Sequence, residues 1–381
     1  MSTTDLFGKP LGQGPVVRLT KWQKRQAALL YHFASLDYLK GLKKLVDDFV
    51  SGVDITLDLA QQQGRDELIV NSQWGVRDTS VNFSTYGFPA LQDFEKSLVK
   101  DIALRAKESY EFSGYIQCAR LIGELGMGWA TPGEEARFEA GMEVIGRYAA
   151  HLDNTMRRLW SDGIVFNVWG SYRAQFPRLP KFRVRTDVVG ESERLPGRTG
   201  VYVPQDDPYG TLQFAWTGNK DGRLFECRAF NDLGLEAVNL LGREGLWGGD
   251  DLRLLALVKQ PKYRDAFLAE KPRMIDEKRY LADPVGVNGF ISSEGISDRS
   301  CKWYFVELID GEFDDETQDD LANQELNHGR LRCPAGQPCP QTGYWLTPAK
   351  SDLRRHFKQG EAMPDLGSDY GVTIWQWDEQ Q

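Results

Sequence analysis

The stretch "RTGVYVPQDDPYGTLQFAWTG", Arg198 to Gly218, decides how the second half of the chain is expected to fold. Two short runs rich in β-branched and aromatic residues flank the cluster Asp-Asp-Pro-Tyr-Gly, whose composition is typical of a turn. The stretch therefore predicts two antiparallel strands joined by that turn. Similar short runs follow Gly163, among them "IVFNVWGSY", "FRVRTDVVG", "RLFECRAF" and "CKWYFVELI". They are also expected to form antiparallel strands, with short helices at "LGLEAVNLLG" and "DDLRLLALV".

A related stretch, "QTGYWLTP", follows near the C-terminus. Both stretches place Thr-Gly before an aromatic strand that ends at a proline, and the glycines can adopt the positive φ of a tight turn. Two similar hairpins that serve as scaffolding are expected, rather than two active sites, although so short a repeat can also arise by chance. The last strand, "IWQW", places its two tryptophans on one face. The structural motif comprises Thr199, Gly200, Tyr202, Pro204, Thr342, Gly343, Trp345, Pro348, Trp375 and Trp377.

The first 163 residues have a helical pattern instead. Thr20 and Gln23 have the spacing of a capping box, and apolar residues then recur at steps of three, four and seven as far as Phe49. A further helix is expected near Pro89, and another begins at Thr131 with Glu134 closing its capping box. Alternating βαβ units are absent from the pattern. The sequence predicts an α+β protein with a mainly helical domain, residues 1–163, followed by an antiparallel α+β domain, residues 164–381.

Composition and charge bear on the class of protein. The 381 residues carry a formal net charge of −9, which argues against nucleic acid as a partner because phosphates need a basic surface. The N-terminus lacks the pattern of a secretory signal, and no run reaches the roughly 18 apolar residues of a membrane span. We therefore expect a cytoplasmic protein that does not bind membranes.

Candidate catalytic and metal-binding residues are sparse. Glu325 and His328 could share a helical face, but a metal site needs more than two ligands. Cys333 and Cys339 are too far apart for a zinc knuckle, and the prolines around them favour a rigid turn. No nucleophile elbow, phosphate-binding loop or dinucleotide fingerprint is present. We expect no catalytic residues, no cofactor and no metal.

One segment, "DGEFDDETQDD", has a strong charge pattern, and we call it the acidic block. It does not fit an EF-hand, because Asp315 occupies the sixth position, where that loop requires glycine. Two readings remain open: a solvated loop, or a surface that steers a basic partner by electrostatic attraction. The candidate partner-binding residues are Asp310, Glu312, Asp314, Asp315, Glu316, Asp319 and Asp320.

Two regions carry a resemblance to a known group of proteins. The run from Cys333 to Asp378, and "RTGVYVPQDDPYGTLQFAWTG" with "FNDLGLEAV" after it, resemble bacterial polymorphic-toxin immunity proteins of families seventy-one and seventy-two. The resemblance spans about half the chain, from roughly residue 165 onward, and the N-terminal half contains no motif of this group. It implies a protein that binds and neutralises a cognate toxin, often one delivered by type VI secretion, and it implies no enzymatic activity.

Two alternatives stay open beside an inhibitor of one toxin, for which the acidic block suggests a basic protein. The chain could be an enzyme, such as a hydrolase that reverses the damage of the toxin or acts on a small substrate. It could also be an adaptor of the secretion apparatus, which would bind many effectors. A deep polar pocket with convergent carboxylates would favour the enzyme.

Overall fold

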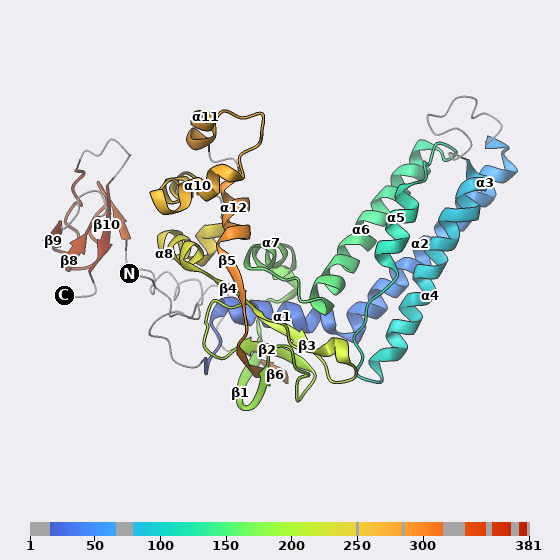
Figure 1. Cartoon of the computed structure of the whole chain (residues 1–381), viewed down its shortest axis with the longest axis horizontal. Coiled ribbons are helices and arrows are strands. Elements are labelled where there is room, and N and C mark those ends of the chain that lie inside the picture. Colours follow the sequence, from blue (N-terminus) through green and yellow to red (C-terminus); the bar gives the residue numbers. More distant parts are fainter. Residues whose placement is uncertain are drawn as a thin grey trace. The chain divides into compact units, whose positions relative to one another are not determined.

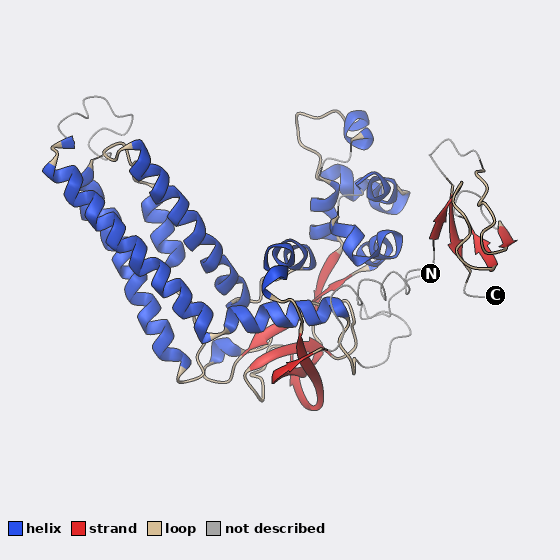
Figure 2. Cartoon of the chain, turned by 180° about the vertical axis from the view of Figure 1, so that it is seen from behind, coloured by secondary structure: helices blue, strands red, loops and turns tan. Residues whose placement is uncertain are grey.

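The computed structural model describes residues 16–65, 79–248, 251–283, 286–314, 332–347, 353–366 and 373–378. About 53% of the chain is helical and 17% is strand, and a helical N-terminal region precedes a region rich in antiparallel sheets, so the α+β prediction is confirmed (Figure 1, Figure 2). The chain groups into two compact units. Residues 1–175 with 180–312 form the first, and residues 176–179 with 313–381 form the second.

The first unit begins with two helices where one was expected. Thr20 caps α1 (Lys21–Ala34) and forms the predicted capping box with Gln23. Ser35 then adopts an extended conformation, and its side chain accepts a hydrogen bond from the backbone of Tyr38, which starts α2 (Leu36–Gln62). The apolar period continues across this one-residue break, because Tyr38 and Leu39 of α2 are buried like Phe33 of α1.

Four helices lie side by side (Figure 1). Beside α2 they are α4 (Phe88–Arg105), α5 (Tyr115–Gly123) and α6 (Pro132–Met156), with α3 (Ser80–Asn82) and a π-helical turn (Phe83–Gly87) leading into α4. The predicted capping box of Thr131 and Glu134 starts α6, with Pro132 at its first position.

The segment "IVFNVWGSY" was expected to be a strand, and this expectation is wrong. It forms α7 (Asp162–Tyr172), which Ser161 caps by accepting a hydrogen bond from the backbone of Ile164. β-Branched and aromatic residues favour strands only moderately, so a cap and tertiary packing can override their preference. Here Val165 and Trp169 are buried one turn apart, as one face of a helix requires.

The first unit contains a four-stranded sheet in the order β1-β6-β2-β3. Its strands are β1 (Pro180–Glu191), β2 (Gly200–Pro204), β3 (Gln213–Ala215) and β6 (Lys302–Phe313). The predicted hairpin joins β2 to β3, with Asp207 in the turn accepting hydrogen bonds from the backbones of Tyr209 and Gly210. Because α1 packs on β2 and β3, the predicted domain boundary at residue 163 lies inside this unit.

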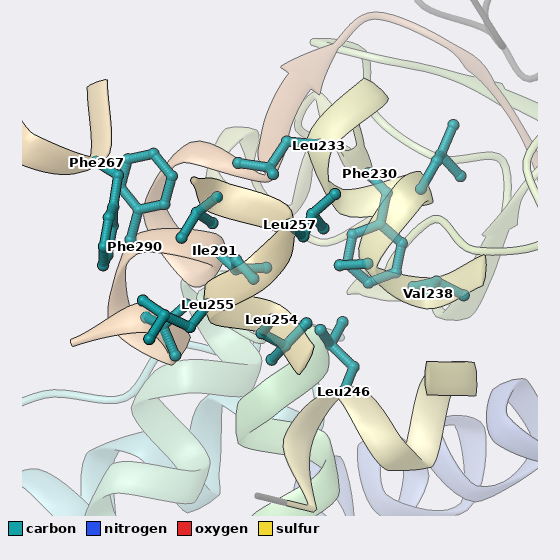
Figure 3. Packing of buried hydrophobic residues seen from close by; sticks show 14 of the residues in the cluster. Phe230, Leu233, Val238, Leu246, Leu254, Leu255, Leu257, Phe267, Phe290 and Ile291 are labelled. Atoms are coloured by element: carbon teal, nitrogen blue, oxygen red, sulfur yellow. The ribbon is translucent and has the colours of Figure 1, made fainter. Parts of the chain in front are cut away.

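A helical insertion lies between β3 and β6 in the sequence. Strands β4 (Cys227–Phe230) and β5 (Ile296–Arg299) pair with each other and enclose α8 (Asp232–Trp247), α9 (Asp251–Val258), α10 (Pro261–Ala269), α11 (Glu277–Ala282) and α12 (Val287–Glu294). These helices have a core of their own, in which Phe267 packs against Phe290 and Ile291 lies close to Leu255 (Figure 3).

The second unit contains another four-stranded sheet, in the order β7-β10-β8-β9. Its strands are β7 (Arg332–Pro334), β8 (Gly343–Leu346), β9 (Arg354–Phe357) and β10 (Ile374–Trp377). Trp345 and Trp375 are fully buried in its core, and Trp377 packs on Trp345 at 5.4 Å between ring centroids. In both sheets the strand that comes last in the sequence lies between the first and the second.

The two Thr-Gly stretches build their hairpins with the same contacts. Gly200 pairs with Ala215, and the Thr199 hydroxyl accepts a hydrogen bond of 3.1 Å from the backbone of Thr217, two residues beyond Ala215. In the second sheet Gly343 pairs with Phe357, and the Thr342 hydroxyl accepts one of 2.8 Å from Gln359, again two residues further on.

The aromatic residue two positions after each glycine adds a second shared contact. The Tyr202 hydroxyl donates to the carbonyl of Arg198 at 2.7 Å, and the Trp345 indole donates to the carbonyl of Gln341 at 3.2 Å. Both acceptors lie four residues before the donor. In each motif the threonine side chain therefore extends the pairing of the two strands by one hydrogen bond. The aromatic side chain links the start of the strand to the residues before it.

The glycines of the motif do not lie in the expected tight turns. Gly200 and Gly343 are the first residues of β2 and β8, with φ values of 151° and 158°. Gly200 is required by close approach instead, because a Cβ atom there would lie 2.6 Å from Phe305 Cε2 and 2.8 Å from the Tyr31 hydroxyl. Pro204 ends β2 as predicted, whereas Pro348 lies outside the described residues.

Candidate functional site

The structure describes only part of the acidic block. Asp310, Glu312 and Asp314 lie at the end of β6, whereas Asp315, Glu316, Asp319 and Asp320 lie outside the described residues. Asp310 and Glu312 are exposed, and the backbone N–H of Asp314 donates to the carbonyl of Leu179. The described part of the block is therefore the exposed end of a sheet strand.

A row of basic residues on β1 faces this end of β6, and we call the two rows together the charge ladder. Lys181 Nζ lies 2.7 Å from Glu312 Oε2, and further along the strands Arg183 and Arg185 lie 3.6 Å and 3.1 Å from the carboxylate of Glu307. Exposed ion pairs of this kind add little stability. They do turn one flank of the acidic block into a surface of mixed charge, which the block's sequence alone does not indicate.

Two carboxylates on this surface, Glu312 and Asp187, have lowered pKa values. The hydrogen bond from Lys181 lowers the pKa of Glu312. The hydrogen bonds from the Arg185 guanidinium lower the pKa of the Asp187 carboxyl to about 2. A partner that meets this surface at neutral pH therefore meets fixed charges of both signs.

His151 lies in a cluster with two tyrosine hydroxyls, a side-chain set that could carry acid–base chemistry. His151 Nδ1 lies 3.0 Å from the Tyr38 hydroxyl and 3.2 Å from the Tyr172 hydroxyl, and the two hydroxyls lie 3.1 Å apart. Burial lowers the pKa of His151 to about 4, with smaller contributions from the charges of His32 and Arg147. Burial also raises the pKa of Tyr38.

The direction of these shifts decides what the cluster can do. A general acid or base works best when its pKa lies near the working pH, and the pKa of His151 lies well below pH 7. Its Nδ1 lies within hydrogen-bonding distance of both tyrosine hydroxyls, which joins α2, α6 and α7 at one point. We interpret the cluster as a structural junction.

A buried ion pair forms a second junction in the first unit. Asp162 accepts hydrogen bonds from Arg243 Nε at 2.9 Å and Nη2 at 2.5 Å, and its other oxygen accepts one of 2.8 Å from the Trp247 indole. Arg243 also donates to the carbonyl of Tyr209, and its guanidinium lies 5.0 Å from the centroid of the Trp22 ring. These contacts join α1, α7 and α8 to the turn between β2 and β3.

The two cysteines considered as metal ligands lie in the core of the second unit. The Cys333 thiol lies 3.5 Å from the carbonyl of Pro338, and the Cys339 thiol lies 3.1 Å from that of Gln341. In the parts of the chain that the structure describes, no three His, Cys, Asp or Glu side chains come close enough to hold a metal ion. Glu325 and His328 lie outside those parts.

The sequence did not reveal the charge ladder or the Asp162–Arg243 pair. Both join residues more than 80 positions apart, and a single sequence contains no signal for such pairing. Lys181, Arg183 and Arg185 alternate along β1, so that all three belong to one face of the strand.

No protein-family model, curated protein or solved structure matches the chain. Of the helices in the described ranges, none combines the length and the apolar character that a membrane crossing requires.

Proposed function

We propose that the chain is a bacterial immunity protein that binds one cognate toxin in the cytosol and neutralises it as a stoichiometric inhibitor. The proposal starts from the resemblance of residues 198–218 and 333–378 to immunity families seventy-one and seventy-two. The toxin is a protein, and a basic toxin fits the acidic block best.

The observation that carries the proposal is the exposed position of the first acidic residues of the block. Residues 310–320 contain seven acidic residues and no basic one, and Asp310 and Glu312 are exposed near the end of β6. A dense negative charge steers a basic partner toward it and raises the association rate. The oppositely charged residues of β1 beside it would help to fix the orientation of that partner.

The motif residues support a scaffold role for the region of resemblance. Tyr202, Trp345 and Trp375 are fully buried and belong to the cores of the two sheets. These residues form the core of a scaffold, and the exposed loops and strand ends of a scaffold can recognise a partner. The pKa of about 4 makes His151 a weak general base, which also favours an inhibitor over a hydrolase that would use this histidine.

The test requires the toxin domain encoded next to this protein. Toxin activity titrated with the purified chain should fall to zero at one inhibitor per toxin. Protection at far below one inhibitor per toxin would overturn the proposal, because only a catalyst can act in that way. Binding to several unrelated effectors with similar affinity would favour the adaptor instead.

Binding kinetics test the role of the acidic block. Changing Asp314, Asp315, Asp319 and Asp320 to Asn should lower the association rate about tenfold or more at low salt, with little change in the dissociation rate. The difference from the wild type should shrink at high salt, which screens the attraction.

A matched control neutralises four exposed acidic residues outside the block, all in the first unit: Glu124, Glu139, Asp265 and Glu270. It removes the same net charge and should leave the association rate nearly unchanged. Equal losses in both variants would mean that net charge, and not the position of the block, governs the encounter. A raised dissociation rate in the block variant would place these residues inside the interface.

A further inference from the structure

A cleft opens between α2 and α6 in the first unit. Its volume is about 160 Å³. Phe49, Val53, Met127, Trp129 and Phe138 supply its apolar lining. The function proposed above makes no use of it.

The apolar lining is held in place by aromatic packing. The ring centroids of Phe49 and Phe138 lie 5.2 Å apart, and Phe83 packs on both Phe138 and Trp129 at 5.8 Å and 5.3 Å. Gly141 permits this arrangement, because a Cβ atom there would lie 2.5 Å from the Phe49 ring. The lining is therefore a preformed aromatic surface rather than a gap that side chains can easily fill.

One polar group in the cleft wall has no partner. Trp129 is 1% exposed, and its indole N–H forms no hydrogen bond with the residues that the structure describes. A buried donor without an acceptor costs free energy. The nitrogen lies within the wall, out of contact with the space that a ligand would fill.

The rim of the cleft carries charges of both signs. Asp48 and Arg137 line it. Glu134 also lines the cleft, but its carboxylate is already bound by Arg65. A basic residue beside the occupant would pair with Asp48, and an acidic one with Arg137.

We propose that this cleft binds an aromatic side chain of a partner protein. The size agrees, since an engineered apolar cavity of about 150 Å³ takes up a benzene ring. Rings pack well edge-on against other rings and against the sulfur of methionine, as the lining offers here. A single anchor of this type at the centre of an interface can supply much of the binding energy. The identification of the partner as the toxin rests on the function proposed above. The binding of an aromatic ring in the cleft is independent of that function.

The test uses N-acetyl-L-phenylalaninamide as the probe and the full-length chain labelled with ¹⁵N at its indole nitrogens. The Trp129 resonance is assigned from the spectrum of a Trp129→Phe variant. Addition of the probe should shift this resonance in a saturable way, with a dissociation constant of about 1 mM for so small a ligand. N-acetylglycinamide, which lacks the ring, should leave the resonance in place.

Gly52 provides a variant that blocks the cleft without disturbing the fold. It lines the cleft from α2, and a Cβ atom there would meet no atom within 4 Å, so Gly52→Leu adds bulk without a clash. Leucine also favours a helix over glycine, so the melting temperature should not fall. Gly170→Leu on α7 is the matched control, since Gly170 has the same free space and does not line the cleft.

We expect Gly52→Leu to weaken probe binding at least tenfold and Gly170→Leu to leave it unchanged. Unchanged probe binding in Gly52→Leu, or an equal shift with N-acetylglycinamide, would overturn the inference. If the chain fails to inhibit the toxin but binds the probe as expected, the proposed function falls and the aromatic site stands.

Discussion

Replacing Asp162 by alanine should destabilise the first unit strongly. The change leaves the Arg243 guanidinium inside the protein with only two carbonyl acceptors, those of Pro208 and Tyr209. The side chains of Asp162 and Arg243 are 4% and 11% exposed, so water cannot replace the lost carboxylate. The Trp247 indole would lose its acceptor at the same time.

The magnitude follows from the burial of the pair. Breaking a buried ion pair by removing one partner costs about 3–5 kcal/mol, because an uncompensated charge stays behind. Asp162→Asn should cost less, since the amide oxygen still accepts hydrogen bonds from Arg243. The double variant Asp162→Ala/Arg243→Met should recover part of the loss, because both buried charges are then gone.

Urea unfolding followed by far-UV circular dichroism measures these differences. An exposed pair serves as the control: Asp153→Ala, which removes the partner of Arg157, should cost less than about 1 kcal/mol. A cost below about 1 kcal/mol for Asp162→Ala would refute the reasoning. So would a double variant less stable than Asp162→Ala alone.

Two further predictions concern the His151 cluster and Gly200 of the first hairpin. His151 has a pKa of about 4 in the folded chain against an ordinary value of 6.5, so the unfolded state takes up the proton first as the pH falls. Stability should therefore decrease between about pH 6.5 and pH 4. Asp101 acts in the opposite sense, because burial raises its pKa from 3.8 to about 6. The test therefore compares the wild type with His151→Gln. This variant should lose the contribution of the histidine and keep that of Asp101. An identical pH dependence of the two melting temperatures would contradict this. Gly200→Ala should cost about 1–3 kcal/mol by overpacking against Phe305 and Tyr31, whereas Gly197→Ala, where a Cβ atom would meet nothing within 4 Å, should be close to neutral in the same thermal melts.

The sequence was most informative where structure is encoded locally. The capping boxes at Thr20 and Thr131 involve residues three positions apart, and both helices begin where they predict. The strands of the Thr-Gly stretches were also recognisable, because alternation and turn composition are local signals. The break at Ser35 was missed because the apolar period runs through it, and α7 was missed because its residues prefer strands while its environment selects a helix.

The candidate sites were less accessible from the sequence. The acidic block is a local feature and was found, but its pairing with Lys181 depends on how β1 and β6 align across more than 100 residues. The α2–α6 cleft depends on the packing of Phe49 against Gly141, which no spacing rule indicates. Chain connectivity, rather than composition, decides which of these groups meet.

The order of strands in the two sheets has a consequence for how the chain folds. In each sheet the strand made last during synthesis, β6 or β10, takes a central position between two strands made earlier. Until it arrives, β1 and β7 have no neighbour to pair with, and the hairpins β2-β3 and β8-β9 expose an open edge. For the first sheet this wait spans the whole helical insertion, which can form its own core in the meantime. Closure of the sheets should therefore be the slow and aggregation-sensitive step of folding, set by loop closure over a long segment.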